Sequence, residues 1–106
     1  MRRVALAGER EIDRFESVAA RVRRVSSEAH VAVITIGAGG TVGRHAAAAQ
    51  QLFVVVRGSG WVAGGDGRRE PVTTGEAVLW DAGEDHQSGT DEGLAALVVE
   101  ADSLEL

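Results

Sequence analysis

Residues 39–58 read GGTVGRHAAAAQQLFVVVRG, and residues 75–90 read GEAVLWDAGEDHQSGT. Both segments place one histidine behind glycines at a fixed spacing, Gly-x5-His in the first and Gly-x7-Gly-x2-His in the second. Glycine adopts the positive φ angles that tight reversals require, so these glycines mark the ends of short strands. The apolar runs between the glycines predict strands, and we expect His45 and His86 to meet on neighbouring strands.

Short apolar runs separated by glycines continue through the rest of the chain. They occupy residues 31–36, 52–56, 61–63, 77–80 and 94–100. β-branched and aromatic runs of this length between turn residues are typical of a β-sandwich or a β-barrel. Residues 64–67, Gly-Gly-Asp-Gly, have the composition of a tight hairpin turn. We therefore expect an all-β chain with little helix that folds as a single domain over residues 1–106.

The N-terminal third has a less regular pattern. Between residues 11 and 25, apolar side chains recur at positions 12, 15, 18, 19, 22 and 25, which is partly helical spacing. The same side chains fit equally well on short strands that lead into a barrel. We expect a strand near residues 3–7 and mixed structure from there to Arg24.

The composition argues against several kinds of function. The net charge is −5, from 16 acidic and 11 basic residues, which argues against a nucleic-acid partner. The absence of cysteine removes disulfides, thiolate nucleophiles and zinc–thiolate sites. The first residues, MRRVALAG, lack the apolar run of a signal peptide, and no run approaches the roughly 20 apolar residues of a membrane span. We expect a cytoplasmic protein with no membrane partner.

One segment also suggests a different fold. Residues 31–52 read VAVITIGAGGTVGRHAAAAQQL, and this β-branched run, its glycines and its alanine run resemble a dinucleotide-binding turn followed by a helix. The interval from Gly43 to Arg57 is too short for the rest of a βαβ unit, which needs about 30 residues. No helical period follows Leu52, so no helices are predicted to cover a parallel sheet. We therefore favour a barrel in which residues 37–43 form a turn and residues 46–49 a strand or loop.

The two glycine-framed segments resemble the two motifs of the cupin superfamily, and the resemblance covers about residues 31–99. Residues 51–60 match Glu-x3-Val-x2-Gly-x-Gly, with Gln51 in the glutamate position. Residues 75–86 match Gly-Asp…Pro-x-Gly-x2-His, with Asp81 in the proline position, and Thr90 stands where the family has asparagine. The resemblance implies a jelly-roll β-barrel. The chain is similar to short single-domain bacterial cupins, many of which lack an assigned activity.

The resemblance also implies a candidate metal site. In a metal-binding cupin, the first motif supplies two histidines and a glutamate, and the second supplies one histidine. Here His45 and His86 match, but Ala47 and Gln51 replace the second histidine and the glutamate. The implied ligands are therefore His45, Gln51 and His86, for one divalent ion of Fe, Mn, Ni, Cu or Zn. A neutral amide does not offset the charge of a metal ion as a carboxylate does, so we expect a metal-free or weakly metal-bound site.

Alternation along the strands predicts which side chains face the barrel interior. The residues of one parity, expected to point inward, are His45, Ala47, Gln51, Phe53 and Val55. We predict that a ligand pocket in the barrel mouth is lined by Ala47, Phe53, Val55 and Trp80. Asp81 or Glu84 could supply the missing carboxylate, although spacing alone does not place them there, and His30 is expected at an exposed strand edge.

Three functions are compatible with such a pocket. The first is the binding of a small molecule in the barrel mouth, without metal or with a weakly held one. The second is a metal-dependent cupin enzyme, an oxygenase or an isomerase/cyclase, that uses His45 and His86 as ligands or as acid–base groups. The third is a structural or protein-interaction barrel. Small barrels tend to cover open edges and homodimers are the commonest oligomers, so we also expect a homodimer formed through the N-terminal segment.

Overall fold

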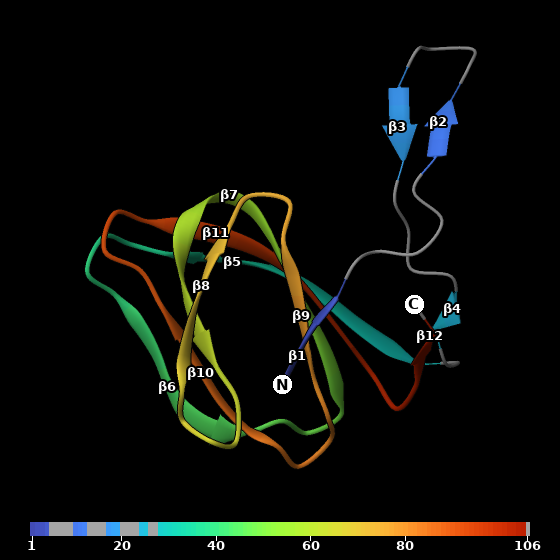
Figure 1. The fold of residues 1–106 in the computed structure, drawn as a ribbon. Coiled ribbons are helices and arrows are strands. Elements are labelled where there is room, and N and C mark those ends of the chain that lie inside the picture. Colours follow the sequence, from blue (N-terminus) through green and yellow to red (C-terminus); the bar gives the residue numbers. More distant parts are fainter. Residues whose placement is uncertain (5–9, 13–16, 20–23, 26–27, 106) are drawn as a thin grey trace.

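The computed structural model describes residues 1–4, 10–12, 17–19, 24–25 and 28–105, and every regular element within them is a strand (Figure 1). The strands are β1 (Arg2–Val4), β2 (Arg10–Ile12), β3 (Ser17–Ala19), β4 (Arg24–Val25), β5 (Ala29–Ile36), β6 (Thr41–Ala46), β7 (Gln50–Ala63), β8 (Arg69–Thr73), β9 (Ala77–Trp80), β10 (Asp85–Gly89), β11 (Leu94–Ala101) and β12 (Leu104–Glu105). The prediction of an all-β fold is therefore confirmed.

Eight of these strands form one continuous sheet that wraps around a common interior (Figure 1). One half of the sheet has the order β1, β9, β7, β11, β5, and the other half has the order β8, β7, β10, β6, with every pair antiparallel. The 14-residue β7 belongs to both halves. Its first part pairs with β9 and β11, and its second part pairs with β8 and β10.

β7 passes from one half to the other at a glycine-rich corner. Gly58 has a φ of 79°, and a Cβ atom there would lie 2.2 Å from the carbonyl oxygen of Gly93. A Cβ atom on Gly60 would lie 2.1 Å from the carbonyl oxygen of Gly89. Only glycine fits such close backbone approaches, so these two residues allow β7 to bend between its partners.

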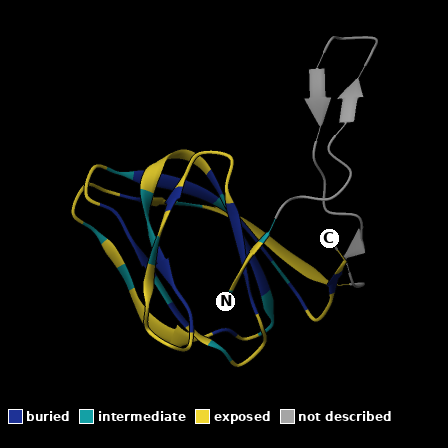
Figure 2. Ribbon diagram, viewed as in Figure 1, coloured by how far each residue is buried: buried dark blue, intermediate teal, exposed yellow. Residues whose placement is uncertain are grey.

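Two apolar clusters follow from the alternation of side chains along the strands. The inner cluster faces the barrel interior and contains Ile36, Ala47, Phe53, Val55, Val62, Val72, Val78, Trp80, Leu94, Ala96 and Val98. The outer cluster, made by side chains of the opposite parity, contains Leu52, Ala77, Leu79, Val99, Ala101 and Leu104. Figure 2 shows that buried residues concentrate on β7, β9 and β11, whereas β5 and β6 are largely exposed.

The glycine-rich and alanine-rich segments form the connections between strands that the barrel interpretation predicts. Residues 37–40 form the turn between β5 and β6, and residues 47–49 connect β6 to β7 without a helix, so the dinucleotide-binding alternative is wrong. The predicted hairpin turn is confirmed, because the N–H of Gly67 donates to the carbonyl of Gly64 at 2.9 Å.

The N-terminal third is described only in part. The expected strand near residues 3–7 is seen as β1, and residues 5–7 lie outside the described part of the chain. Of the segment with partly helical spacing, the described residues belong to β2, β3 and β4, and the others lie outside the description. Among the described residues there is no helix with the length and apolarity needed to cross a membrane.

Candidate functional site

The two histidines lie side by side on neighbouring strands. His45 on β6 and His86 on β10 are direct register partners, and their ring centroids are 4.2 Å apart. The ring of Trp80, at the end of β9, lies 4.4 Å from the His86 ring, and Phe53 on β7 meets Trp80 edge-on at 5.5 Å. Four rings from four strands therefore form one continuous aromatic wall, with His45 at its solvent-exposed end.

Backbone carbonyls fix the orientation of both imidazole rings. Nδ1 of His45 lies 2.7 Å from the carbonyl oxygen of Gly43, and Nδ1 of His86 lies 3.3 Å from that of Glu84. A carbonyl oxygen only accepts, so Nδ1 carries the proton in each neutral ring. Nε2 of each histidine is then left with a lone pair that can accept a hydrogen bond or bind an electrophile.

The environment of His86 keeps its ring neutral at pH 7. The side chain is only 3% exposed, and this burial, with the nearby charge of His45, lowers its pKa below the ordinary value of 6.5. The carbonyl of Glu84 and the carboxylates of Glu100 and Glu84 oppose the lowering without reversing it. His86 therefore enters any reaction near neutral pH as a base or hydrogen-bond acceptor, not as a cation.

A cavity of about 300 Å³ lies between the two halves of the barrel. It is lined by His30, Ala32, Ile34, Thr35, Ile36, Val42, His45, Gln51, Phe53, Trp80, His86, Ser88, Val98 and Glu100. Its size is at the lower end of the range that holds small organic ligands. His30 and Ala32 on the edge strand β5 are solvent exposed, so the cavity opens to solvent beside β5.

Strand register arranges the polar groups of the cavity in a row. Glu100 on β11 lies directly opposite His30 on β5 and opposite Gln51 on β7, and Gln51 in turn lies opposite Trp80 on β9. The next row inward along the same strands is apolar and consists of Ala32, Val98, Phe53 and Val78. The cavity therefore combines a polar row at one end with apolar walls beyond it.

Only some of the site and pocket residues predicted from the sequence line the cavity. His45, Gln51, His86, Phe53 and Trp80 all line the cavity. Two residues expected in the pocket, Ala47 and Val55, are instead buried in the inner apolar cluster. Neither predicted substitute carboxylate lines the cavity: Asp81 is exposed, and Glu84 accepts hydrogen bonds from the backbone N–H groups of Asp81 and Gly65 at 3.1 Å each.

Two titratable residues of the cavity, Glu100 and His30, were not predicted to line it. Glu100 was treated as the end of an apolar run, and His30 was expected at an exposed strand edge. His30 is indeed exposed, but it also faces the cavity. The alternation of Ala96, Val98 and Glu100 contained a signal, because an inward-facing apolar pair predicts that the residue two positions later also faces inward.

The donor atoms fit a tightly held metal ion poorly. The ligand set implied by the family is two imidazoles and the neutral amide of Gln51. Within the part of the chain that the structure describes, no three His, Cys, Asp or Glu side chains group closely enough to hold a metal ion. Two histidines and a carboxylate are the usual minimum for a non-haem iron centre, and this arrangement does not provide it.

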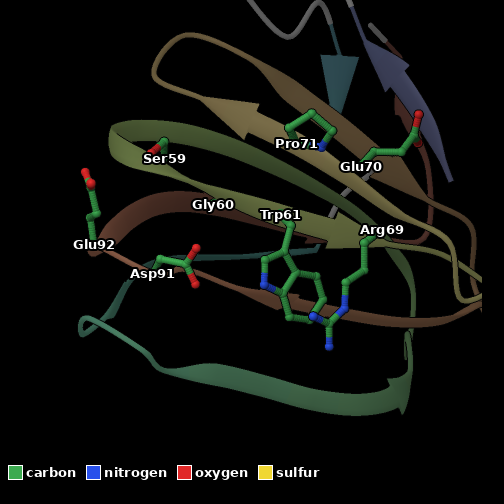
Figure 3. Close-up of a pocket in the computed structure, with 8 residues that line it drawn as sticks. All are labelled: Ser59, Gly60, Trp61, Arg69, Glu70, Pro71, Asp91 and Glu92. Atoms are coloured by element: carbon green, nitrogen blue, oxygen red, sulfur yellow. The ribbon is translucent and has the colours of Figure 1, made fainter.

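A second hollow lies on the surface around Trp61 and shares no residue with the cavity (Figure 3). It has a volume of about 480 Å³, and Ser59, Asp91 and Glu92 lie at one end. The guanidinium carbon of Arg69 lies 3.8 Å from the centroid of the Trp61 ring, and Figure 3 shows the two side chains packed together. Because Arg69 already covers this aromatic face, the hollow offers a ligand less than the barrel cavity does.

Comparison with known proteins connects this geometry to a family. The family model for the cupin domain matches residues 32–100. None of the curated proteins compared with the chain matches it.

Solved structures give matches over most of the chain. A predicted oxalate decarboxylase from Thermotoga maritima is 23% identical, with a TM-score of 0.61 over 67% of this chain and 64% of that one. The polyketide cyclase RemF from Streptomyces resistomycificus is 25% identical, with a TM-score of 0.63 over 72% of this chain and 56% of that one. A Cupin 2 conserved barrel domain protein from Salinispora arenicola is 22% identical, with a TM-score of 0.65 over 76% of this chain and 69% of that one.

Proposed function

This chain belongs to the cupin domain family, and from that premise we propose that it binds a small organic molecule in the cavity beside His45, His86 and Trp80. The binding requires no tightly held metal ion, because no three His, Cys, Asp or Glu side chains of the described residues group closely enough to hold one. The aromatic wall supplies the contact surface, and the polar row orients the ligand.

The observation that carries this proposal is the unpartnered amide of Gln51 at the cavity wall. Gln51 is only 8% exposed and lines the cavity, yet its side chain has no hydrogen-bond partner among the described residues. Every fully buried side-chain N or O atom of the described residues has a hydrogen-bond partner, so the amide of Gln51 is accessible from the cavity. A ligand in the cavity can therefore hydrogen-bond this amide without displacing a protein partner.

A second candidate function is proton transfer to or from the bound ligand, as in an isomerase or cyclase. It is supported by the neutral, oriented ring of His86, whose Nε2 lone pair suits a general base. The likeness to a polyketide cyclase, at 25% identity, adds to this support. Both candidates need the same cavity, so ligand binding is the first property to test.

The two tryptophans make the test simple, because each reports on a different hollow. In a ¹H–¹⁵N NMR spectrum the chain has two indole N–H signals, that of Trp80 for the cavity and that of Trp61 for the surface hollow. The Trp61→Phe variant assigns them. We expect the neutral probe 3-phenylpropan-1-ol to shift the Trp80 signal in a saturable way and to leave the Trp61 signal in place.

A blocking variant and its matched control locate the binding. Ala32→Phe places a ring at the exposed mouth of the cavity and should abolish the shift of the Trp80 signal. Val33→Phe, on the opposite face of the same strand, should preserve it, because Val33 is 67% exposed and does not line the cavity. A shift of the Trp61 signal alone, or equal binding by both variants, would contradict the proposal.

A further inference from the structure

We propose that the cavity selects organic cations, with a protonated amine held by Glu100 and Gln51 and an apolar body lying against Phe53 and Trp80. This inference rests on the proposed function and adds the chemical class of the ligand. It follows from the hydrogen-bonding character of the polar row, from the charges at the mouth and from the aromatic wall.

The polar groups of the cavity are mainly acceptors. Nδ1 of both histidines is engaged with a backbone carbonyl, so each imidazole in its neutral form presents a lone pair at Nε2. The carboxylate of Glu100 only accepts, and the unpartnered amide of Gln51 offers its carbonyl oxygen as well as its N–H groups. An ammonium group donates up to three hydrogen bonds and accepts none, so it matches this set, whereas a carboxylate ligand would face lone pairs.

Charge favours the same ligand class. Glu100 is the only Asp, Glu or Arg among the described residues that line the cavity, and no described side chain forms an ion pair with it. An adjoining cleft of about 260 Å³ shares His30 and Glu100 with the cavity and adds Glu28 and Asp102. A cation approaching beside β5 therefore passes two carboxylates, Glu28 and Asp102, and no arginine of the described chain before it reaches Glu100.

The register brings the anionic and aromatic groups within reach of one small ligand. Glu100, Gln51 and Trp80 lie on three adjacent strands, whose spacing is about 4.8 Å. An amine placed between Glu100 and Gln51 therefore lies about one and a half strand spacings from β9, which carries Trp80, and an alkyl chain of a few carbons bridges that distance. The rings of Trp80 and Phe53 supply apolar contact and attract cations through their faces.

Three probes with the same body and different heads test the proposal. The probes are 3-phenylpropylamine, 3-phenylpropan-1-ol and 4-phenylbutyrate, in which a phenyl ring and three methylene groups carry an ammonium, a hydroxyl or a carboxylate. Titration followed by the Trp80 indole signal at pH 7 should give the amine at least about tenfold tighter binding than the alcohol, with the carboxylate weakest. Equal affinities, or tightest binding by the carboxylate, would overturn the inference.

Isosteric variants assign the selectivity to one carboxylate. Glu100→Gln should reduce the preference for amine over alcohol to about twofold or less while the affinity for the alcohol stays the same. Asp102→Asn removes a charge from the outer cleft only and should keep most of the preference. A preference that survives Glu100→Gln, or that Asp102→Asn removes equally, would contradict the assignment to Glu100.

Two further outcomes separate this inference from the proposed function. If none of the three probes moves the Trp80 signal, the small-molecule function itself fails. If the alcohol binds but the amine gains nothing, the function stands and the inference fails. A titration with Zn²⁺ tests whether the cavity binds a metal ion instead of an amine, because a divalent ion would use the same lone pairs. A Trp80 response to Zn²⁺ together with no response to the amine would overturn the inference.

Discussion

The protonation of His86 couples the site to the stability of the fold. Because the pKa of His86 is lowered in the native state, the unfolded chain takes up this proton at a higher pH than the native protein does. Between the ordinary pKa of 6.5 and the lowered native value, the unfolded state therefore holds more protons, and the free energy of unfolding decreases as the pH falls. His45, Glu84 and Glu100 are the charged groups that act on this ring.

Replacing His86 should flatten this pH dependence. We expect His86→Gln to lose less stability than the native protein when the pH falls from 7.5 to 5, because glutamine does not titrate. Urea unfolding at several pH values measures the slope, which is independent of any constant loss caused by the substitution. The range stays above pH 5 because the pKa of Glu84 is also lowered, and its contribution is lost only below 4.5. Identical slopes for the two proteins would contradict the prediction.

We expect Gln51 to limit the affinity of the site for metal ions. Gln51→Glu would supply a carboxylate beside the two imidazoles and complete a set that divalent transition metals bind well. We expect saturating Zn²⁺ to raise the Tm of this variant by about 5–10 °C after chelator treatment, and to raise that of the native protein much less. Ser88→Glu, which adds a carboxylate elsewhere on the cavity wall, is the control. Equal shifts for native protein and Gln51→Glu would show that the missing carboxylate is not the limiting ligand.

At the scale of the element, the corner of β7 depends on glycine for two reasons. Gly58 combines a positive φ with contact to the Gly93 backbone, whereas Gly75 has a φ of 89° and open space, and Gly37 has neither constraint. We expect alanine at Gly58 to lower the free energy of unfolding by about 3 kcal/mol or more, at Gly75 by about 1–2 kcal/mol and at Gly37 by about 0.5 kcal/mol or less. Denaturant unfolding of the three variants measures these free energies. Equal decreases for the variants at Gly58 and Gly75 would show that the close contact between residue 58 and the Gly93 backbone does not contribute.

The sequence predicted the elements better than it predicted their partners. The glycine frames and the β-branched runs gave the strands and the turn at residues 64–67, because those signals are local. The alternation along β6 and β7 also brought His45, Gln51 and Phe53 to one side. Ala47 is a small residue in the connection between strands, where alternation no longer applies, and it is packed into the core instead of the cavity.

The positions of Glu100 and His30 in the cavity depend on pairing between strands that are far apart in the sequence. Glu100 is 49 positions beyond Gln51 and becomes its neighbour only through the pairing of β11 with β7. That register also shifts at an irregularity between Ala95 and Ala96, which no local pattern predicts. The pairing of β11 with β5 places His30 opposite Glu100 at the cavity mouth. The acceptor-rich row was therefore visible only in the folded chain, although each of its residues lies on a segment that was expected to be a strand or its edge.

At the scale of the whole molecule, the homodimer stays a prediction. β1 pairs with β9 of its own chain, and most of the N-terminal segment expected to exchange lies outside the described residues. The described part offers another contact. β5 pairs with β11 on one edge, no described strand pairs with its other edge, and Val31 and Val33 on it are 65% and 67% exposed. Two copies could cover both edges by antiparallel pairing about a twofold axis.

Charged residues on this edge should separate the copies. We expect the native protein to sediment at twice the chain mass of 11.1 kDa, and a Val31→Lys, Val33→Lys double variant to sediment as a monomer, because lysine on an open edge opposes strand pairing. Asp66→Lys, in the exposed turn before β8, is the control and should remain dimeric. A dimer that withstands the double variant would place the interface elsewhere.

The sharing of β7 by both halves of the sheet has a consequence for how the chain reaches its native state. β7 is paired with β8, β9, β10 and β11, and all four follow it in the sequence. During synthesis, the second part of β7 gains its first partner, β8, just after the turn at residues 64–67, whereas the first part has none until β9 and then β11 have been made. Folding dominated by such distant pairings is slow. Once formed, the halves cannot melt one at a time, so the amide protons of β7 should exchange with solvent only when the entire barrel opens.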